Sequence, residues 1–168
     1  MPILKLKSHP YDELYTPTVA MMPLIKHLPS WANRIWCPCD KPDSKIVLAL
    51  QAAGKEVICT HIDDGHDFFT YEPERGSYDM IITNPPYSVK DAFIKRCVGV
   101  GSPWALLLPV DALSGEKRAK IYEKADGVGC ITIMNRLDFT GKGANWFFNA
   151  WICSWPEING KWIREVAK

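Results

Sequence analysis

The sequence predicts an α/β fold with a mostly parallel sheet, and two observations indicate it. Short apolar runs alternate along the chain with stretches of helical spacing, which is the element order of layered α/β proteins. The segment 78–83 contains the consecutive apolar residues Met80, Ile81 and Ile82, as expected for a strand that is covered on both faces. We therefore expect a three-layer α/β sandwich, with helices on both sides of the sheet.

Local signals place the individual elements. Gly54 follows a helical pattern and is a good stop signal, Pro109 ends an apolar strand, and Pro23 interrupts the first helix. Helices are expected at 18–28, 44–53, 89–98 and 115–124, and strands at 34–37, 56–62, 78–83, 104–108, 129–135 and 150–155. The last two strands are expected to form an antiparallel pair at an edge of the sheet. Gly141 and Gly143 predict a flexible turn between them.

Length and composition indicate one ordinary globular domain over residues 1–168, since 47% of the residues are hydrophobic and 23% are charged. No apolar run approaches the roughly 20 residues of a membrane helix, and residues 1–7 lack a signal-peptide core, so we expect a cytoplasmic protein. The net charge of +1 gives little support for a protein that binds duplex DNA unaided, because such binding usually needs a basic surface.

The cysteines do not predict a metal site. Cys37 and Cys39 form Cys-Pro-Cys, which differs from the two-residue gap of common zinc sites, and no second Cys or His pair follows closely. The four histidines also lack ligand spacing, so no metal is expected. The other cysteines lie singly in apolar surroundings and are expected to be buried reduced thiols: Cys59, Cys97, Cys130 and Cys153.

The most informative motif is Asn84-Pro85-Pro86-Tyr87, directly after the buried strand at 78–83. Two prolines fix the backbone and remove two N–H donors, so the Pro85 carbonyl is held as a rigid acceptor. The Asn84 side chain supplies a second acceptor, and Tyr87 supplies a stacking face. Two acceptors converging on one amino group would orient a weakly nucleophilic aryl amine and stabilise positive charge on its nitrogen. The alternative is a proline-stiffened turn.

This motif resembles that of the amino-methyltransferase family, which acts on adenine N6, cytosine N4 or glutamine amides with S-adenosylmethionine. The resemblance implies a Rossmann-like fold with a seven-stranded type of sheet and an antiparallel last strand. It implies N6 methylation of adenine in nucleic acid, with DNA favoured over RNA. Asn84 and Pro85 would then orient the amino group, Pro86 would stiffen the loop, and Tyr87 would stack on the base.

Two further segments resemble cofactor-binding segments of that family. Tyr15, Thr16 and Pro17 precede the first helix, and a similar Tyr-Thr-Pro segment of the adenine branch contacts the methionine end of the cofactor. Asp67 and Phe68 resemble the Asp-Phe segment that binds the cofactor adenine. Both segments also have plain structural interpretations, because Thr-Pro is a sensible helix start and Asp67 could be a loop aspartate beside core phenylalanines.

The chain departs from the family pattern at the first two strand ends. The first strand is normally followed by an acid and a glycine-rich turn, which lets the backbone approach the cofactor. Here the loop has no glycine, and Asp40 is expected to replace the missing acid. At the second strand end, His61 stands where a ribose-binding acid is expected, directly before Ile62. The resemblance nevertheless implies a cofactor site that includes Cys37, Pro38, Cys39, Asp40, His61 and Ile62.

Several interpretations stay open at this point. The chain is similar to small, often phage-associated proteins with such altered loops, which would be divergent enzymes. Alternatively, it is a catalytically inactive binding or decoy protein, or it methylates glutamine in a protein. A partner protein is expected to help select the target, since the chain leaves little room for a recognition domain. The aromatic segment 145–149 could stack on an extruded base or pack in the core.

Overall fold

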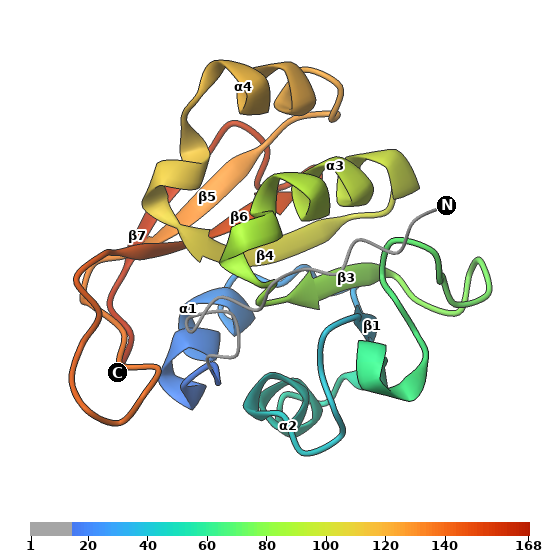
Figure 1. The fold of residues 1–168 in the computed structure, drawn as a ribbon, viewed down its shortest axis with the longest axis horizontal. Helices are drawn as coiled ribbons and strands as arrows, with labels where there is room; N and C mark the ends of the chain where they lie inside the picture. The colour runs from blue at the N-terminus through green and yellow to red at the C-terminus, as the bar shows by residue number, and fades with distance from the viewer. Residues whose placement is uncertain (1–14) are drawn as a thin grey trace.

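The computed structural model describes residues 15–168 (Figure 1). One seven-stranded sheet runs through it, in the order β2-β1-β3-β4-β6-β5-β7. The strands are β1 (Arg34–Cys37), β2 (Glu56–Cys59), β3 (Met80–Thr83), β4 (Trp104–Pro109), β5 (Gly129–Ile133), β6 (Asn149–Ser154) and β7 (Trp162–Glu165). Strands β2, β1, β3 and β4 are parallel, whereas β6 is antiparallel to both of its neighbours, β4 and β5.

The predicted mostly parallel sheet is confirmed, with two corrections at its C-terminal half. The strand β6 was expected at an edge, but it lies between β4 and β5. The edge is formed instead by β7, which pairs in parallel with β5 and was not predicted. Its residues Trp162 and Arg164 are exposed and alternate with the half-buried Ile163 and Glu165, so β7 lacks the apolar run that marks the interior strands.

Helices cover both faces of the sheet, as predicted for a three-layer sandwich. The α-helices are α1 (Met21–Ile25), α2 (Lys45–Ala52), α3 (Lys90–Val100) and α4 (Glu116–Tyr122), and the 3-10 helices are η1 (Thr18–Ala20), η2 (Ile62–Asp64), η3 (Tyr87–Val89) and η4 (Val110–Leu113). Figure 1 shows α1 and α2 on one side of the sheet and α3 and α4 on the other. No helix of residues 15–168 is long and apolar enough to cross a membrane.

Alternating residues of each strand pack into two separate hydrophobic cores, one on each face of the sheet. Ile35 and Cys37 of β1 pack in the core beneath α1 and α2, whereas Trp36 between them packs on the α3 side. The same alternation separates Met80 and Ile82 from Ile81 in β3. Successive side chains of a strand point to opposite faces of the sheet. A strand that is buried on both faces therefore needs apolar residues at consecutive positions.

Several element ends follow their sequence signals. The Ser44 side chain accepts a hydrogen bond from Ile46 N over 3.2 Å and caps α2, and the chain turns after α2 at Gly54, which has a φ of 79°. The expected strand 56–62 is shorter than predicted and ends at Cys59. His61 caps the 3-10 turn of η2 instead, because its ring nitrogen accepts from the N–H of Asp63.

Candidate active site at the carboxyl edge of the sheet

The carboxyl ends of β1, β2, β3 and β4 lie at one edge of the sheet, because these strands are parallel. The order reverses at β1, since the chain continues to β2 on one side and later to β3 on the other. Open α/β sheets bind ligands in the crevice at such a switch point. A hydrogen bond of 3.0 Å from Thr83 Oγ1 to Asp40 Oδ2 spans this switch point. It joins the ends of β1 and β3.

Asn84 lies directly beyond β3 and has one engaged and one unengaged polar atom. Its Nδ2 donates to Thr16 Oγ1 over 2.9 Å, so the expected segment at 15–17 does reach the motif after β3. Its Oδ1 is buried and has no hydrogen-bond partner among the described residues. Such atoms are uncommon, because an unpaired buried acceptor costs about 1–3 kcal/mol. Asn84 therefore has one acceptor that no group of the described residues uses.

The prolines of the motif connect β3 to the helix that follows. Pro85 is buried, and Pro86 is extended, with φ −56° and ψ 124°. The carbonyl of Pro86 accepts from Val89 N over 3.1 Å, which closes the 3-10 turn η3 before α3 begins. The motif is thus a rigid connection between a buried strand and a helix.

Tyr87 is contacted by the first residue of β6, which lies two strands from β3 in the sheet. Its hydroxyl accepts a hydrogen bond of 2.9 Å from Nδ2 of Asn149, the fully buried first residue of β6. Its ring meets Phe147 edge-on, with ring centroids 5.9 Å apart. Burial raises the pKa of Tyr87 well above its ordinary value, so the phenol stays neutral. The side chain is therefore an apolar ring fixed at both ends.

Asp40 is the centre of a small polar network in the loop after β1. Its Oδ1 accepts from Ser44 Oγ over 2.6 Å, in addition to the bond from Thr83 to Oδ2. Its backbone N–H donates to Thr60 O over 3.2 Å, which extends the pairing of β1 and β2 beyond their last residues. Asp40 thus joins the ends of three adjacent strands.

Asp40 is 8% exposed, and no Lys or Arg of residues 15–168 forms an ion pair with it. His61 is close enough for its positive charge to favour the ionised form of Asp40. Burial raises the pKa of its carboxyl above the ordinary range, although the hydrogen bonds from Ser44 and Thr83 oppose the shift. A buried carboxylate in this state favours a cationic ligand.

Of the two cysteines in Cys-Pro-Cys, Cys37 is buried and Cys39 is half-buried. Cys37 is fully buried in the core, and its neighbour Pro38 is also buried. Burial raises the pKa of Cys37 and of Cys39 far above the ordinary thiol range. All six cysteines are free thiols, and no metal-binding group of three or more Cys, His, Asp or Glu occurs within the described part of the chain.

The second strand end carries an exposed ion-pair cluster. Lys41 Nζ contacts Asp63 Oδ2 at 2.8 Å, and His61 Nδ1 lies 3.3 Å from the same oxygen. Ile62 is 61% exposed between them. These side chains lie in neighbouring loops at the candidate site, with little of the burial that marks Asp40.

Asp67 and Phe68 face different surroundings. The Asp67 carboxylate accepts from Phe69 N over 2.9 Å and begins a turn. Phe68 is 3% exposed and stacks on Phe93 with centroids 4.7 Å apart. Its ring is therefore part of the core, as in the structural alternative considered from the sequence. Tyr15, at the other extreme, is 80% exposed.

Three residues of the site were not predicted from the sequence: Ser44, Thr83 and Asn149. Thr83 had a local signal, because it is the polar last residue of an otherwise apolar strand that precedes the motif. Ser44 was recognised only as part of a helix start. Asn149 had no local signal, because its partner Tyr87 lies 62 residues away.

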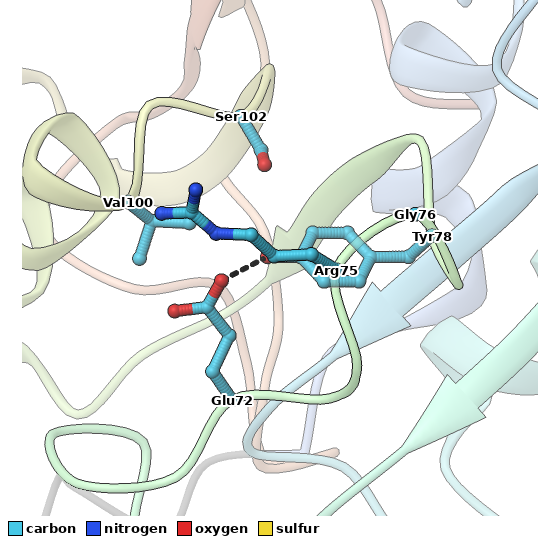
Figure 2. A pocket seen from close by; sticks show the side chains of 6 residues that line it. All are labelled: Glu72, Arg75, Gly76, Tyr78, Val100 and Ser102. Atoms are coloured by element: carbon cyan, nitrogen blue, oxygen red, sulfur yellow. Dashed lines mark hydrogen bonds between the residues drawn. The ribbon is translucent and has the colours of Figure 1, made fainter.

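A hollow of about 250 Å³ lies away from this edge, close to the amino ends of β3 and β4 (Figure 2). Glu72, Arg75, Gly76, Tyr78, Val100 and Ser102 line it. The hydroxyl of Tyr78 donates to Glu72 Oε1 over 3.2 Å, and Arg96 contacts the other carboxylate oxygen at 3.4 Å. Because it lies at the amino ends of these strands, this hollow is not part of the candidate site at their carboxyl ends.

Comparison with known proteins gives no match to a protein-family model and no match among curated proteins. Solved structures do resemble this chain. A candidate class I S-adenosylmethionine-dependent methyltransferase from Listeria monocytogenes overlays with a TM-score of 0.53 and 11% identity, over 98% of this chain and 69% of that one. A candidate RNA methyltransferase from Pyrococcus horikoshii overlays with a TM-score of 0.55 and 12% identity, over 86% of this chain and 87% of that one.

A third structure is the release-factor-specific protein-(glutamine-N5) methyltransferase from Alicyclobacillus acidocaldarius. It overlays with a TM-score of 0.45 and 16% identity, over 83% of this chain and 90% of that one. At the identities of the first two structures, 11% and 12%, a likeness establishes the architecture and leaves the reaction to the site itself. Together with the strand order, those two show that this chain has the Rossmann-like fold of class I S-adenosylmethionine-dependent methyltransferases.

Proposed function

We propose that this protein transfers a methyl group from S-adenosylmethionine to N6 of adenine in nucleic acid, with DNA favoured over RNA. The observation that carries the proposal is the unpaired side-chain carbonyl of Asn84, placed between the end of β3 and the fixed ring of Tyr87. An amino group on a planar base fits both features, because it donates hydrogen bonds and presents a face for stacking.

The residues at the carboxyl edge fit the cofactor. The buried carboxylate of Asp40 would accept from the cofactor ammonium, since no Lys or Arg of the described residues pairs with it. Thr16, His61 and Asp67 lie on the loops around this edge and would contact other parts of the molecule. Tyr15 and Ile62 are exposed and would cover it from outside, whereas Cys37 and Phe68 support the site from the core.

When bound, the cofactor supplies an electrophilic methyl group on a positively charged sulfur. Asn84 Oδ1 and the Pro85 carbonyl accept hydrogen bonds from the target amine and turn its lone pair toward the methyl carbon. As the amine nitrogen takes the methyl group it would gain positive charge, and it would then release one proton to bulk water. The two acceptors stabilise that charge where it develops. Tyr87 fixes the plane of the base.

Two measurements test the proposal. Titration calorimetry should detect binding of S-adenosylmethionine, and ligand at 100 times its dissociation constant should stabilise the fold by about 2.7 kcal/mol. Transfer of a radiolabelled methyl group should then be measured on single-stranded DNA, duplex DNA, RNA and a glutamine-containing peptide, followed by nucleoside analysis. Label in N6-methyladenine supports the proposal. Label only in the peptide or only in cytosine would show a different substrate and contradict the proposal.

A second candidate is a methyltransferase-fold binding module without activity. Two observations favour it: Asn84 Oδ1 has almost no exposed surface, and both oxygens of Asp40 already accept hydrogen bonds within the protein. In that case the polar network at the switch point is structural. The calorimetric titration separates the two candidates, because a closed network gives neither heat nor a thermal shift with S-adenosylmethionine.

A further inference from the structure

The aromatic segment 146–148, which lies between β5 and β6, extends the surface of the candidate site. Phe147 contacts Tyr87 edge-on at 5.9 Å and contacts Trp146 edge-on at 5.3 Å, so three rings form a continuous row. Trp146 is 82% exposed and Phe148 is 42% exposed. The structure thus removes the core-packing alternative for Trp146, the outermost ring of the row.

The connection that carries these rings also holds two exposed cations, Arg136 and Lys142. The Arg136 guanidinium lies 5.3 Å from the centroid of the Phe148 ring, and Arg136 forms no ion pair among residues 15–168. The acid of this connection, Asp138, is turned inward, because its carboxylate accepts from the N–H groups of Thr140, Gly141 and Gly143.

The turn predicted at Gly141 and Gly143 is present in the structure, and Asp138 accepts three backbone hydrogen bonds of 2.8–3.0 Å within it. Asn145 N also donates to Leu137 O over 2.9 Å and closes the base of the loop. Trp146 and Arg136 are the next residues outward on either side of this closure. The segment is therefore held in place before any ligand arrives.

We propose that the aromatic segment 146–148 binds the unpaired nucleotides that flank the target base, with Trp146 stacking on one of them. Single-stranded nucleic acids bind to rows of exposed rings with a few cations, because every base has a face that stacks and every phosphate carries a negative charge. The row starts at Tyr87, so a base on Trp146 would be a neighbour of the target in the strand. This inference rests on the proposed function, since it takes nucleic acid as the substrate.

The test measures binding by fluorescence anisotropy, without cofactor, to labelled single strands of about 15 nucleotides in DNA and RNA forms. Trp146→Ala should weaken binding about tenfold, which is the effect expected for loss of one stacked base. Trp162→Ala is the matched control. Trp162 is also exposed, at 64%, but it begins β7 and pairs with Cys130 near the amino end of β5. The aromatic segment 146–148 follows the carboxyl end of β5. This control should change the affinity less than twofold, and thermal unfolding should show both variants folded.

A strand of the same length without bases provides the second arm. Wild type should bind it more weakly, and Trp146→Ala should bind it as wild type does, because no base is left to stack. If the two exposed cations of this connection, Arg136 and Lys142, each contact one phosphate, the logarithm of the affinity for single strands should fall with the logarithm of the salt concentration at a slope of about −1.4. A markedly steeper slope would point to phosphate contacts elsewhere and contradict the proposal.

Other outcomes overturn it as plainly. These are equal losses in the two Trp variants, an equal loss on the base-free strand, or no binding of either single strand by wild type. Self-association that Trp146→Ala abolishes would reassign the segment to a protein interface. Because the assay contains no cofactor, its result is independent of the calorimetric titration. Nucleic acid binding without S-adenosylmethionine binding would leave this surface in place and remove the proposed reaction.

Discussion

The buried side chain of Asn149 donates a hydrogen bond of 2.9 Å to the hydroxyl of Tyr87, from a strand that is 62 residues further along the chain. Asn149 pairs with Pro109 across β4 and β6, so its position is set by the sheet and not by the motif. The other amide atom, Oδ1, has no partner among the described residues. The ring of Tyr87 is therefore oriented by a residue whose amide is otherwise unsatisfied.

Tyr87→Phe should lower the free energy of unfolding by about 1–3 kcal/mol, because it leaves the amide of Asn149 buried without an acceptor. Urea denaturation measures this loss. Asn149→Ala in the Tyr87→Phe background should cost less than it does alone, since the shared bond is already broken. Strict additivity of the two changes would show that the bond contributes nothing to stability.

Asn84→Ala should reduce methyl transfer about a hundredfold while cofactor affinity stays within a few-fold of wild type. Loss of one oriented acceptor in a transition state costs on the order of 3 kcal/mol. Single-turnover rates with labelled S-adenosylmethionine measure the change. The control is Thr16→Val, which removes the hydroxyl that Asn84 contacts but keeps Asn84 itself. It should slow the reaction less, and an Asn84→Ala protein with full activity would refute the assigned role.

Asp79 should contribute stability that depends on pH. Its carboxylate accepts from Arg34 Nη2 at 2.6 Å and from the backbone N–H groups of Asn33 and Arg34, which tie the start of β3 to β1. The hydrogen bond from Arg34 is the main cause that lowers the pKa of Asp79. The folded pKa lies below the unfolded value near 3.9, so this stability is present above that value and is lost as pH falls through the folded pKa.

The corresponding experiment compares wild type with Asp79→Asn. At pH 7 the variant should be less stable by about 1.5–3 kcal/mol, the contribution of hydrogen bonds to a charged group. The difference should shrink as the pH falls below 4, because wild-type Asp79 becomes neutral as well. Denaturation midpoints measured across this pH range give the answer, and a constant difference would contradict the assignment.

Much of the fold and the core of the site could be predicted from the sequence. Met80, Ile81 and Ile82 are apolar because β3 is covered on both faces, and such a run can be recognised in the sequence. The motif after it follows from adjacency in the chain. The strand β7 could not be predicted in the same way, because an edge strand with exposed Trp162 and Arg164 has no apolar run.

Contacts between distant segments were also beyond the sequence. The ring of Phe68 packs against Trp36 and Phe93 in the core, and neither partner is near it in the sequence. The contact of Tyr87 with Asn149 depends on β6 lying beside β4, between β4 and β5 in the sheet. These contacts depend on the order of strands in the sheet, and the spacing of residues within a short segment does not reveal that order.

A substitution at Asp40 distinguishes a cofactor site with altered contacts from a site that no longer binds the cofactor. Asp40→Asn keeps the shape of the side chain but removes a buried charge, so affinity for S-adenosylmethionine should fall about tenfold or more. A charge-assisted hydrogen bond of this kind contributes roughly 1.5–3 kcal/mol. Stability should not fall in parallel. Burial raises the pKa of Asp40, so its ionisation opposes folding as the pH rises through that pKa, and the neutral variant avoids this cost.

At pH 7, calorimetry measures how far Asp40→Asn lowers the affinity for S-adenosylmethionine, and urea denaturation measures its effect on stability. The affinity should fall clearly, whereas the stability should fall less or should rise. As the pH falls through the raised pKa of Asp40, wild type should lose affinity, whereas Asp40→Asn should not show this loss.

Cys37→Ala is the control from the same loop and should bind nearly as wild type does, because a thiol makes only weak hydrogen bonds. The opposite pattern, with Cys37→Ala impaired and Asp40→Asn intact, would mean that the cofactor contacts a different part of this loop. If wild type itself gives no binding, the hydrogen bonds from Ser44 and Thr83 are the whole role of Asp40, and the glycine-free loop marks a binding module rather than an enzyme.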